Sequence, residues 1–134
     1  MIKKVTLLER AKGDLTVARD IISKNLSDEI QQDIAAYHTG QAIEKILKFI
    51  MAENNIVYLK THEIIKLLGQ LDTACITYPD WIYADHAVIT SYATESRYGE
   101  NITATKRKLI ELLDYTEKWL QEVEASQFNR QHQD

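Results

Sequence analysis

The sequence predicts an all-α protein: an up-and-down four-helix bundle with a fifth helix. Only four glycines and one proline occur in 134 residues, and a turn-rich β fold needs more of these chain breakers. Apolar residues recur at spacings of three and four, which is the period of an α-helix. The connections between these apolar segments are short, and short connections favour antiparallel neighbours. With 45% hydrophobic and 27% charged residues, the composition indicates a globular domain.

The first helix is predicted over residues 5–25. Gly13 interrupts it on the polar side, at a cost of about 1 kcal/mol relative to alanine. One apolar stripe runs along this helix and is formed by Leu8, Ala11, Leu15, Ala18, Ile22 and Leu26.

The second helix, residues 28–54, is the longest. Ser27 is its predicted N-cap, and Asp28 and Glu29 place negative charge at the positive end of the helix dipole. A helix that is apolar on two sides has neighbours on both, so this helix is expected to lie centrally in the bundle or at an oligomer interface. One face carries Ala35, Ala42, Ile46 and Phe49, and the other carries Ala36, Ile43, Leu47 and Ile50.

Three further helices follow a connector at residues 56–60. Thr61 is predicted to cap the third helix, Pro79 and Asp80 precede the fourth, and Asn101 caps the last after a break at Gly99. Their apolar stripes are Ile64, Leu67, Leu68, Leu71 and Cys75, then Trp81, Ala84, Val88 and Tyr92, then Leu109, Leu112, Leu113, Trp119, Leu120 and Val123. Tyr83 and Tyr115 also recur at helical spacing, and these aromatic residues are expected in the core. We therefore predict a single domain over residues 5–126, and a polar tail over residues 127–134 that frays.

Charge and targeting signals exclude several classes of protein. The formal net charge of −4 disfavours a broad electrostatic grip on nucleic acid but leaves room for a local basic pocket. Residues 1–4 are not followed by an unbroken apolar run, so no signal peptide is expected. No apolar stretch approaches the ~20 residues of a membrane span. The predicted location is the cytoplasm, with no membrane partner.

Metal, cofactor and thiol chemistry find no support in the motifs. A di-iron bundle needs glutamate three residues before histidine, but the residues three before His38, His62 and His86 are Ala35, Leu59 and Tyr83. Paired-histidine zinc motifs and glycine-rich phosphate loops are missing as well. The lone Cys75 excludes an intramolecular disulfide, and its apolar surroundings favour a buried structural thiol. Neither a metal nor a cofactor is predicted.

A polar constellation is instead predicted at one end of the bundle. Lys48 lies only about 6 Å of helix rise before Ala52, near the end of the second helix. Antiparallel packing is expected to bring His62 from the third helix, and Arg97 with Tyr98 from the end of the fourth, to the same place. Two helix N-termini add backbone N–H groups there. Together with Lys45, these groups favour a phosphate pocket.

A structural interpretation of the same residues stays open. Glu44 can pair with Lys48 at i, i+4 for a few tenths of a kcal/mol. His62 and Arg97 can satisfy helix-end groups and nothing more. His38 falls on the face of Ala35 and Ala42, and we expect it to be half-buried and hydrogen-bonded within the bundle, although an imidazole that titrates near neutral pH is also a candidate for catalysis.

Three segments carry a family resemblance. Residues 36–48 read AYHTGQAIEKILK, residues 61–64 read THEI before Leu67 and Leu68, and residues 96–98 read SRY. In this order they resemble the second-helix signature, the next helix start and the Ser-Arg-Tyr-Pro segment of HEPN domains (higher eukaryotes and prokaryotes nucleotide-binding), with Gly99 in place of proline. The helical pattern is similar over about residues 5–125.

The resemblance implies a helical bundle that is commonly a homodimer and is often encoded with a minimal nucleotidyltransferase in modules of toxin–antitoxin type. HEPN ribonucleases carry histidine four to six residues after arginine on the last helix. Here those positions hold Asn101, Ile102 and Thr103 after Arg97, so the usual catalytic pair is absent. The site residues that the resemblance implies are Gln41, Glu44, Lys45, Lys48, His62, Arg97 and Tyr98.

Three hypotheses follow. The first is a non-catalytic HEPN protein that engages a nucleotidyltransferase and holds nucleotide phosphate or RNA. The second is a metal-independent endoribonuclease that uses His38 or His62 with Arg97. The third is a purely structural dimeric bundle.

Overall fold

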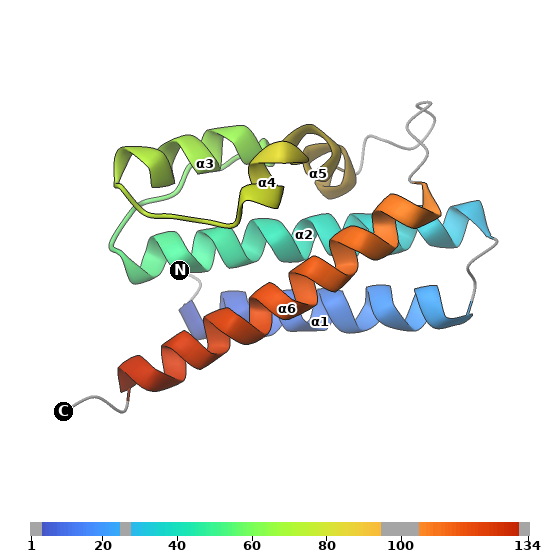
Figure 1. The fold of residues 1–134 in the computed structure, drawn as a ribbon, viewed down its shortest axis with the longest axis horizontal. Coiled ribbons are helices and arrows are strands. Elements are labelled where there is room, and N and C mark those ends of the chain that lie inside the picture. The colour runs from blue at the N-terminus through green and yellow to red at the C-terminus, as the bar shows by residue number, and fades with distance from the viewer. Residues whose placement is uncertain (1–3, 25–27, 95–104, 132–134) are drawn as a thin grey trace.

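The predicted all-α class is confirmed. A computed structural model describes residues 4–24, 28–94 and 105–131, and these stretches contain helices and no strand (Figure 1). The helices are α1 (Lys4–Lys24), α2 (Glu29–Glu53), α3 (Ile64–Thr73), α4 (Asp80–Ala84), α5 (His86–Ala93) and α6 (Lys106–Gln131).

The three long helices form the body of the molecule. α1 and α2 run antiparallel, and α6 lies across them in the direction opposite to α1 (Figure 1). Ion pairs mark the register of α1 and α6: Lys12 lies 3.0 Å from Glu124, and the Arg19 guanidinium lies 2.6 Å from Asp114 and 2.5 Å from Glu117. These pairs raise the pKa of Arg19 above its ordinary value, mainly through the hydrogen bond from Arg19 to Glu117.

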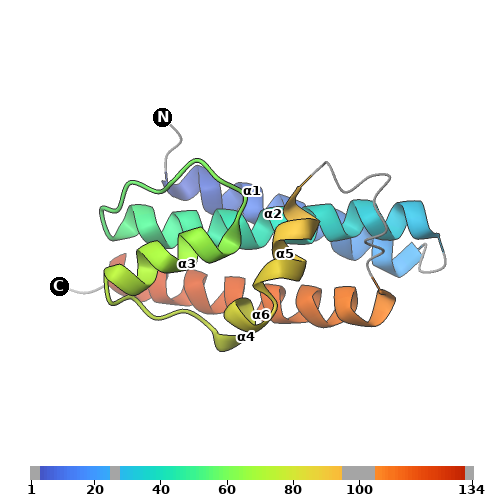
Figure 2. The same cartoon turned by 90° about the horizontal axis from the view of Figure 1, so that it is seen from above.

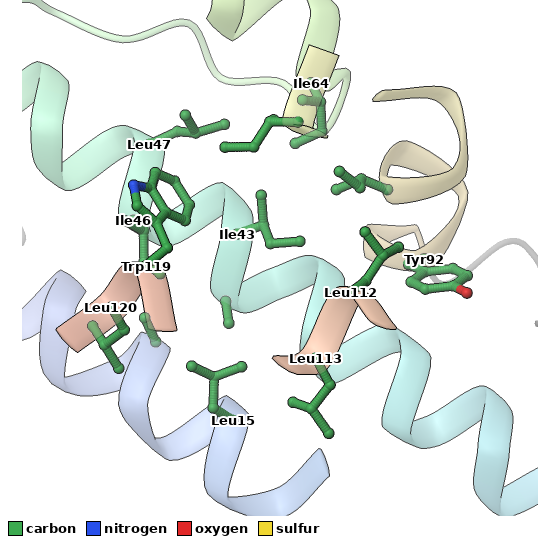
Figure 3. Close-up of a cluster of buried hydrophobic side chains, with 14 of the residues drawn as sticks. Leu15, Ile43, Ile46, Leu47, Ile64, Tyr92, Leu112, Leu113, Trp119 and Leu120 are labelled. Atoms are coloured by element: carbon green, nitrogen blue, oxygen red, sulfur yellow. The ribbon is translucent and has the colours of Figure 1, made fainter. Parts of the chain in front are cut away.

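α2 is the central helix, as its two apolar faces predicted. It packs against α1, α3, α5 and α6. Within the core, Ile43 and Ile46 of α2 are fully buried (Figure 3). The side chains around them come from the other helices and include Leu15, Ile64, Tyr92, Leu112, Leu113, Trp119 and Leu120. One chain by itself therefore covers both faces, and the alternative that one of them forms an oligomer interface is not needed.

The predicted fourth helix is two short helices. α4 ends and α5 begins at Asp85, whose backbone (φ −109°, ψ 21°) leaves the helical region. The break lets Ile82 and Ile89 both reach the core with no exposed surface. α5 then crosses from α6 toward α2 (Figure 2). At one end of this crossing Lys108 lies 3.3 Å from Asp85, and at the other Gln41 Nε2 donates to Ala93 O at 2.8 Å.

α3 runs beside the second half of α2 in the same direction, not antiparallel to it as expected (Figures 1 and 2). The connection after α2 is long enough to turn back along the bundle before α3 begins. Gln70 holds this connection, because its amide donates to Val57 O and accepts from Leu59 N, both at 3.0 Å. α6 likewise begins near the start of α2, whereas the last helix was expected to begin near Ala52.

Several predicted helix ends differ by a few residues. Asp28, not Ser27, is the N-cap of α2, and its carboxylate accepts from Ile30 N and Gln31 N. Ser27 itself lies outside the described residues, as do Gly99 and Asn101. α6 continues to Gln131, so the first part of the predicted tail is helical.

The start of α3 also differs from the prediction. Glu63, not Thr61, is its N-cap, and the first helical N–H, that of Ile64, donates to the Thr90 hydroxyl at 3.0 Å. The Thr61 hydroxyl accepts instead from Glu63 N at 3.0 Å.

Cys75 is exposed, so the prediction of a buried thiol is wrong. α3 ends at Thr73, and Cys75 adopts a left-handed backbone with φ 59°. Ile76 N then donates to Leu71 O, and Cys75 N to Asp72 O, which together form a Schellman motif. This turn directs the thiol to solvent and returns Ile76 to the core. Tyr83 and Tyr115 are also more exposed than predicted, at 58% and 42%.

Candidate functional site

Glu44 is the centre of the first polar cluster. Its side chain projects from the middle of α2 and is only 6% exposed. One carboxylate oxygen accepts from Lys48 Nζ at 2.7 Å, and the other lies 2.8 Å from His62 Nδ1. A buried carboxylate is costly unless its lone pairs are satisfied. Here an ammonium and an imidazole satisfy both oxygens.

The two partners of Glu44 differ in their exposure. The Lys48 side chain is 13% exposed, and its ammonium lies over the Tyr58 ring, 5.3 Å from the centroid. His62 is 59% exposed. When Nδ1–H donates to Glu44, the Nε2 atom of the neutral ring is an acceptor. His62 is therefore an oriented imidazole at the surface, just before α3 begins. We name Glu44, Lys48, Tyr58 and His62 the Glu44 cluster.

A second carboxylate repeats this arrangement on the side of α2 that faces α1. Asp14 of α1 lies 2.8 Å from His38 Nδ1 and accepts from Lys45 Nζ at 2.5 Å. Lys45 Nζ also lies 3.5 Å from Gln41 Oε1. His38 is half-buried and hydrogen-bonded, as predicted. We name Asp14, His38, Gln41 and Lys45 the Asp14 cluster.

The sequence of α2 explains why the two clusters adjoin. Gln41 with Lys45 and Glu44 with Lys48 are i, i+4 pairs, so each pair lies on one side of the helix. Gly40 lets α5 approach closely, because a Cβ there would lie 2.6 Å from Ala93 N. That approach brings Ala93 O within reach of the Gln41 amide.

The formal charges of the two clusters balance. Asp14 and Glu44 each accept from one lysine, so with neutral imidazoles no positive charge is left over. The i, i+4 pairing of Glu44 with Lys48, which the structural interpretation expected, is present. An anion bound here would use the remaining lysine N–H groups and a protonated His62, while the carboxylates hold those donors in position.

Five of the predicted site residues can be located. Gln41, Glu44, Lys45 and Lys48 lie along α2 and not at its end, and His62 reaches Glu44 from the segment before α3. Lys45 and Lys48 belong to different clusters. Arg97 and Tyr98 lie outside the described residues.

Asp14 is the residue that sequence reasoning missed. It is three residues after Ala11 and four before Ala18, both fully buried. An acidic residue on an apolar stripe is a signal for a buried partner, and the antiparallel register of α1 and α2 supplies His38 and Lys45. In the described part of the chain, no group of three or more histidine, cysteine, aspartate or glutamate side chains gathers as a metal site would require. None of the described helices is long and apolar enough to span a bilayer.

Comparison with known proteins gives one match. The sequence model of the HEPN domain matches residues 5–126. No curated protein and no solved structure matches the chain significantly.

Proposed function

The chain belongs to the HEPN domain family, and from this premise we propose that it is a binding protein, the partner subunit of a minimal nucleotidyltransferase in a two-component module of toxin–antitoxin type. Its ligand is a nucleotide phosphate, held along α2 by Gln41, Lys45, Lys48 and His62. Glu44 positions two of these donors. We propose that Arg97 and Tyr98 complete the site.

The buried carboxylate of Glu44 carries this proposal. A bundle that needed only stability would gain as much from apolar side chains at these positions, because a buried ion pair is weak evidence for stability. Glu44 instead holds an ammonium at one carboxylate oxygen and an exposed imidazole at the other. Preorganised donors of this kind are what phosphate recognition requires.

Calorimetric titration with ATP and with inorganic phosphate tests the proposal. His62→Gln is the most informative variant, because His62 is exposed and its loss should leave the fold intact. We expect binding to weaken about tenfold. Lys48→Arg should retain binding, since the charge remains. Lys66→Ala is the matched control, because it removes one exposed cation from α3, where Lys66 pairs with Glu63. This variant should bind ATP and phosphate with unchanged affinity. If His62→Gln binds ATP and phosphate as tightly as the unsubstituted protein, the proposed location of the phosphate site is wrong.

Two carboxylate–imidazole pairs favour a second candidate, a metal-independent endoribonuclease. Asp14 with His38 and Glu44 with His62 each fix an imidazole, as a general base requires. RNA incubated with the purified protein and a chelator should be cleaved, and His62→Ala or His38→Ala should abolish the cleavage. Cleavage that persists in both variants, or never occurs, excludes this candidate.

Homodimerisation is part of the proposal and rests on the family alone. Both faces of α2 are covered within one chain, so its apolar pattern no longer argues for a dimer. Sedimentation at increasing protein concentration tests it, and a single monomeric species throughout would contradict it.

A further inference from the structure

A groove beside the turn between α3 and α4 carries an inference that is independent of the α2 clusters. Its volume is about 810 Å³, within the range of ~300–1,000 Å³ that encloses small ligands or short chain segments. None of its lining residues belongs to the Glu44 or Asp14 cluster. The residues that line the groove are Asp72, Cys75, Ile76, Thr77, Tyr78, Asp80, Tyr83 and Ala84.

The groove is acidic and aromatic. Among the residues that the structure describes, its lining includes two carboxylates and two phenols but no lysine or arginine. The groove between α1 and α6 differs in its charged lining, which includes the cations of Arg19 and Lys12. Glu117 pairs with Arg19, and Glu124 pairs with Lys12. Partial burial and the hydrogen bond to Asp72 raise the pKa of Tyr78, and Tyr83 and Asp80 add to this shift. The carboxylates of Asp72 and Asp80 thus place negative charge near the phenol.

The walls of the groove are held in place before any partner arrives. The Schellman motif fixes the end of α3, and Tyr78 donates to Asp72 Oδ1 at 2.9 Å across the turn. Pro79 then begins α4. A preorganised surface loses little conformational entropy on binding. Of the two tyrosines that line the groove, Tyr83 is the more available to a partner, because it is 58% exposed whereas Tyr78 is half-buried.

We propose that this groove docks a short arginine-containing segment of a protein partner. A guanidinium can stack on the Tyr83 ring and pair with the carboxylate of Asp80, and tyrosine is enriched where partners bind most strongly. Charge complementarity selects this occupant. The charged side chains in the described lining are both carboxylates, and these repel a nucleic acid or an acidic protein surface.

Cys75 makes the proposal testable, because it is the only cysteine of the chain and it lines the groove. The probe is the peptide acetyl-Gly-Arg-Ser-Arg-Gly-amide, and its control carries neutral citrulline in place of arginine. Affinity is measured by NMR titration, and groove occupancy by the rate at which N-ethylmaleimide alkylates Cys75. The arginine peptide should bind and slow alkylation, whereas the citrulline peptide should do neither.

Substitutions then separate the groove from the rest of the surface. Asp80→Asn should weaken peptide binding about two- to fivefold, and Tyr83→Ala about tenfold. Glu122→Gln removes an exposed charge from α6 and should leave binding unchanged.

Equal binding of both peptides, or no protection of Cys75, overturns the proposal. A change of oligomeric state in Tyr83→Ala also overturns it, since the groove would then join two copies. Nucleotide binding by the His62 site is measured separately and can fail without affecting this result.

Discussion

At the scale of single residues, the same residue type has opposite consequences at different positions. Gly13 lies on the exposed side of α1, and a Cβ added there would meet nothing within 4 Å. Gly40 lies where α5 crosses α2, and a Cβ there would lie 2.8 Å from Tyr92 Cβ. Both glycines lie within long helices and lower the helix propensity there. Of the two, only Gly40 lies where the packing of α5 against α2 leaves no room for a side chain.

Gly13→Ala and Gly40→Ala are therefore predicted to act in opposite directions. Gly13→Ala should raise the free energy of unfolding by about 1 kcal/mol. Gly40→Ala should lower it by about 1–3 kcal/mol, because α5 must move away from α2. Chemical denaturation of both variants measures the difference. A stabilised Gly40→Ala variant would show that the two helices do not approach this closely.

At the scale of elements, the ends of the helices decide where side chains point. α2 and α3 both finish with a residue in the left-handed region, Asn55 and Cys75, each at φ 59°. Asparagine tolerates this conformation well, and cysteine does so less readily. In each case the following isoleucine donates its N–H back into the helix, and Ile56 and Ile76 turn toward the core.

The strain at the end of α3 can be relieved. Cys75→Gly should be more stable than Cys75→Ala by about 1 kcal/mol, since glycine has no Cβ to clash at positive φ. Thermal unfolding measures the stability of the two variants. Because both lack the Cys75 thiol, any difference between them reflects the backbone conformation. If alanine is equally stable, the left-handed turn is absent.

Lys108 connects two elements and makes their contact dependent on pH. Its hydrogen bonds to Glu111 and Asp85 raise its pKa above the ordinary 10.5. A group whose pKa is raised by folding stabilises the folded state below the ordinary value and loses that effect as the pH rises through the folded value. The folded protein should therefore be more stable than Lys108→Met at pH 7, and the difference should disappear as the pH rises through the raised pKa of Lys108. Lys106→Met is the control, because Lys106 is exposed. A difference that persists at high pH would contradict the ion pair.

At the scale of the whole molecule, α2 organises the rest of the chain. It packs against four other helices, and its polar residues belong to clusters that include α1 and the segment before α3. The core and the candidate site therefore depend on one helix. A substitution that loosens α2 should lower both the free energy of unfolding and the affinity for the ligand. A substitution in another helix can change one of these quantities without the other.

Ile43→Ala tests this central role. Ile43 is fully buried, so its truncation should cost about 2–5 kcal/mol. Ile30 lies on the same helix but is 69% exposed, and Ile30→Ala should change stability by less than about 0.5 kcal/mol. The two variants share the chemical change and differ only in their surroundings. A similar loss of unfolding free energy in both variants would mean that α2 is not the central helix of the core.

Local pattern was sufficient for the three long helices and for one ion pair of the candidate site. Helical periodicity in the sequence placed α1, α2 and α6 to within a few residues, because burial of an apolar stripe dominates the choice of secondary structure. It also identified Glu44 with Lys48, since an i, i+4 pair is close in any helix. The central position of α2 followed from its two apolar faces.

The remaining features depend on contacts between residues that are distant in the sequence, which no local pattern encodes. The direction of α3 depends on how the Gln70 amide holds the chain at Val57 and Leu59. The break at Asp85 depends on Ile82 and Ile89 both reaching the core. The pairing of Asp14 with His38 and Lys45 depends on the register of α1 against α2. The sequence by itself determined the three long helices and the two buried faces of α2, because helical periodicity is a local property. The tertiary structure alone decided which side chains from distant segments meet, because those contacts depend on how the helices pack.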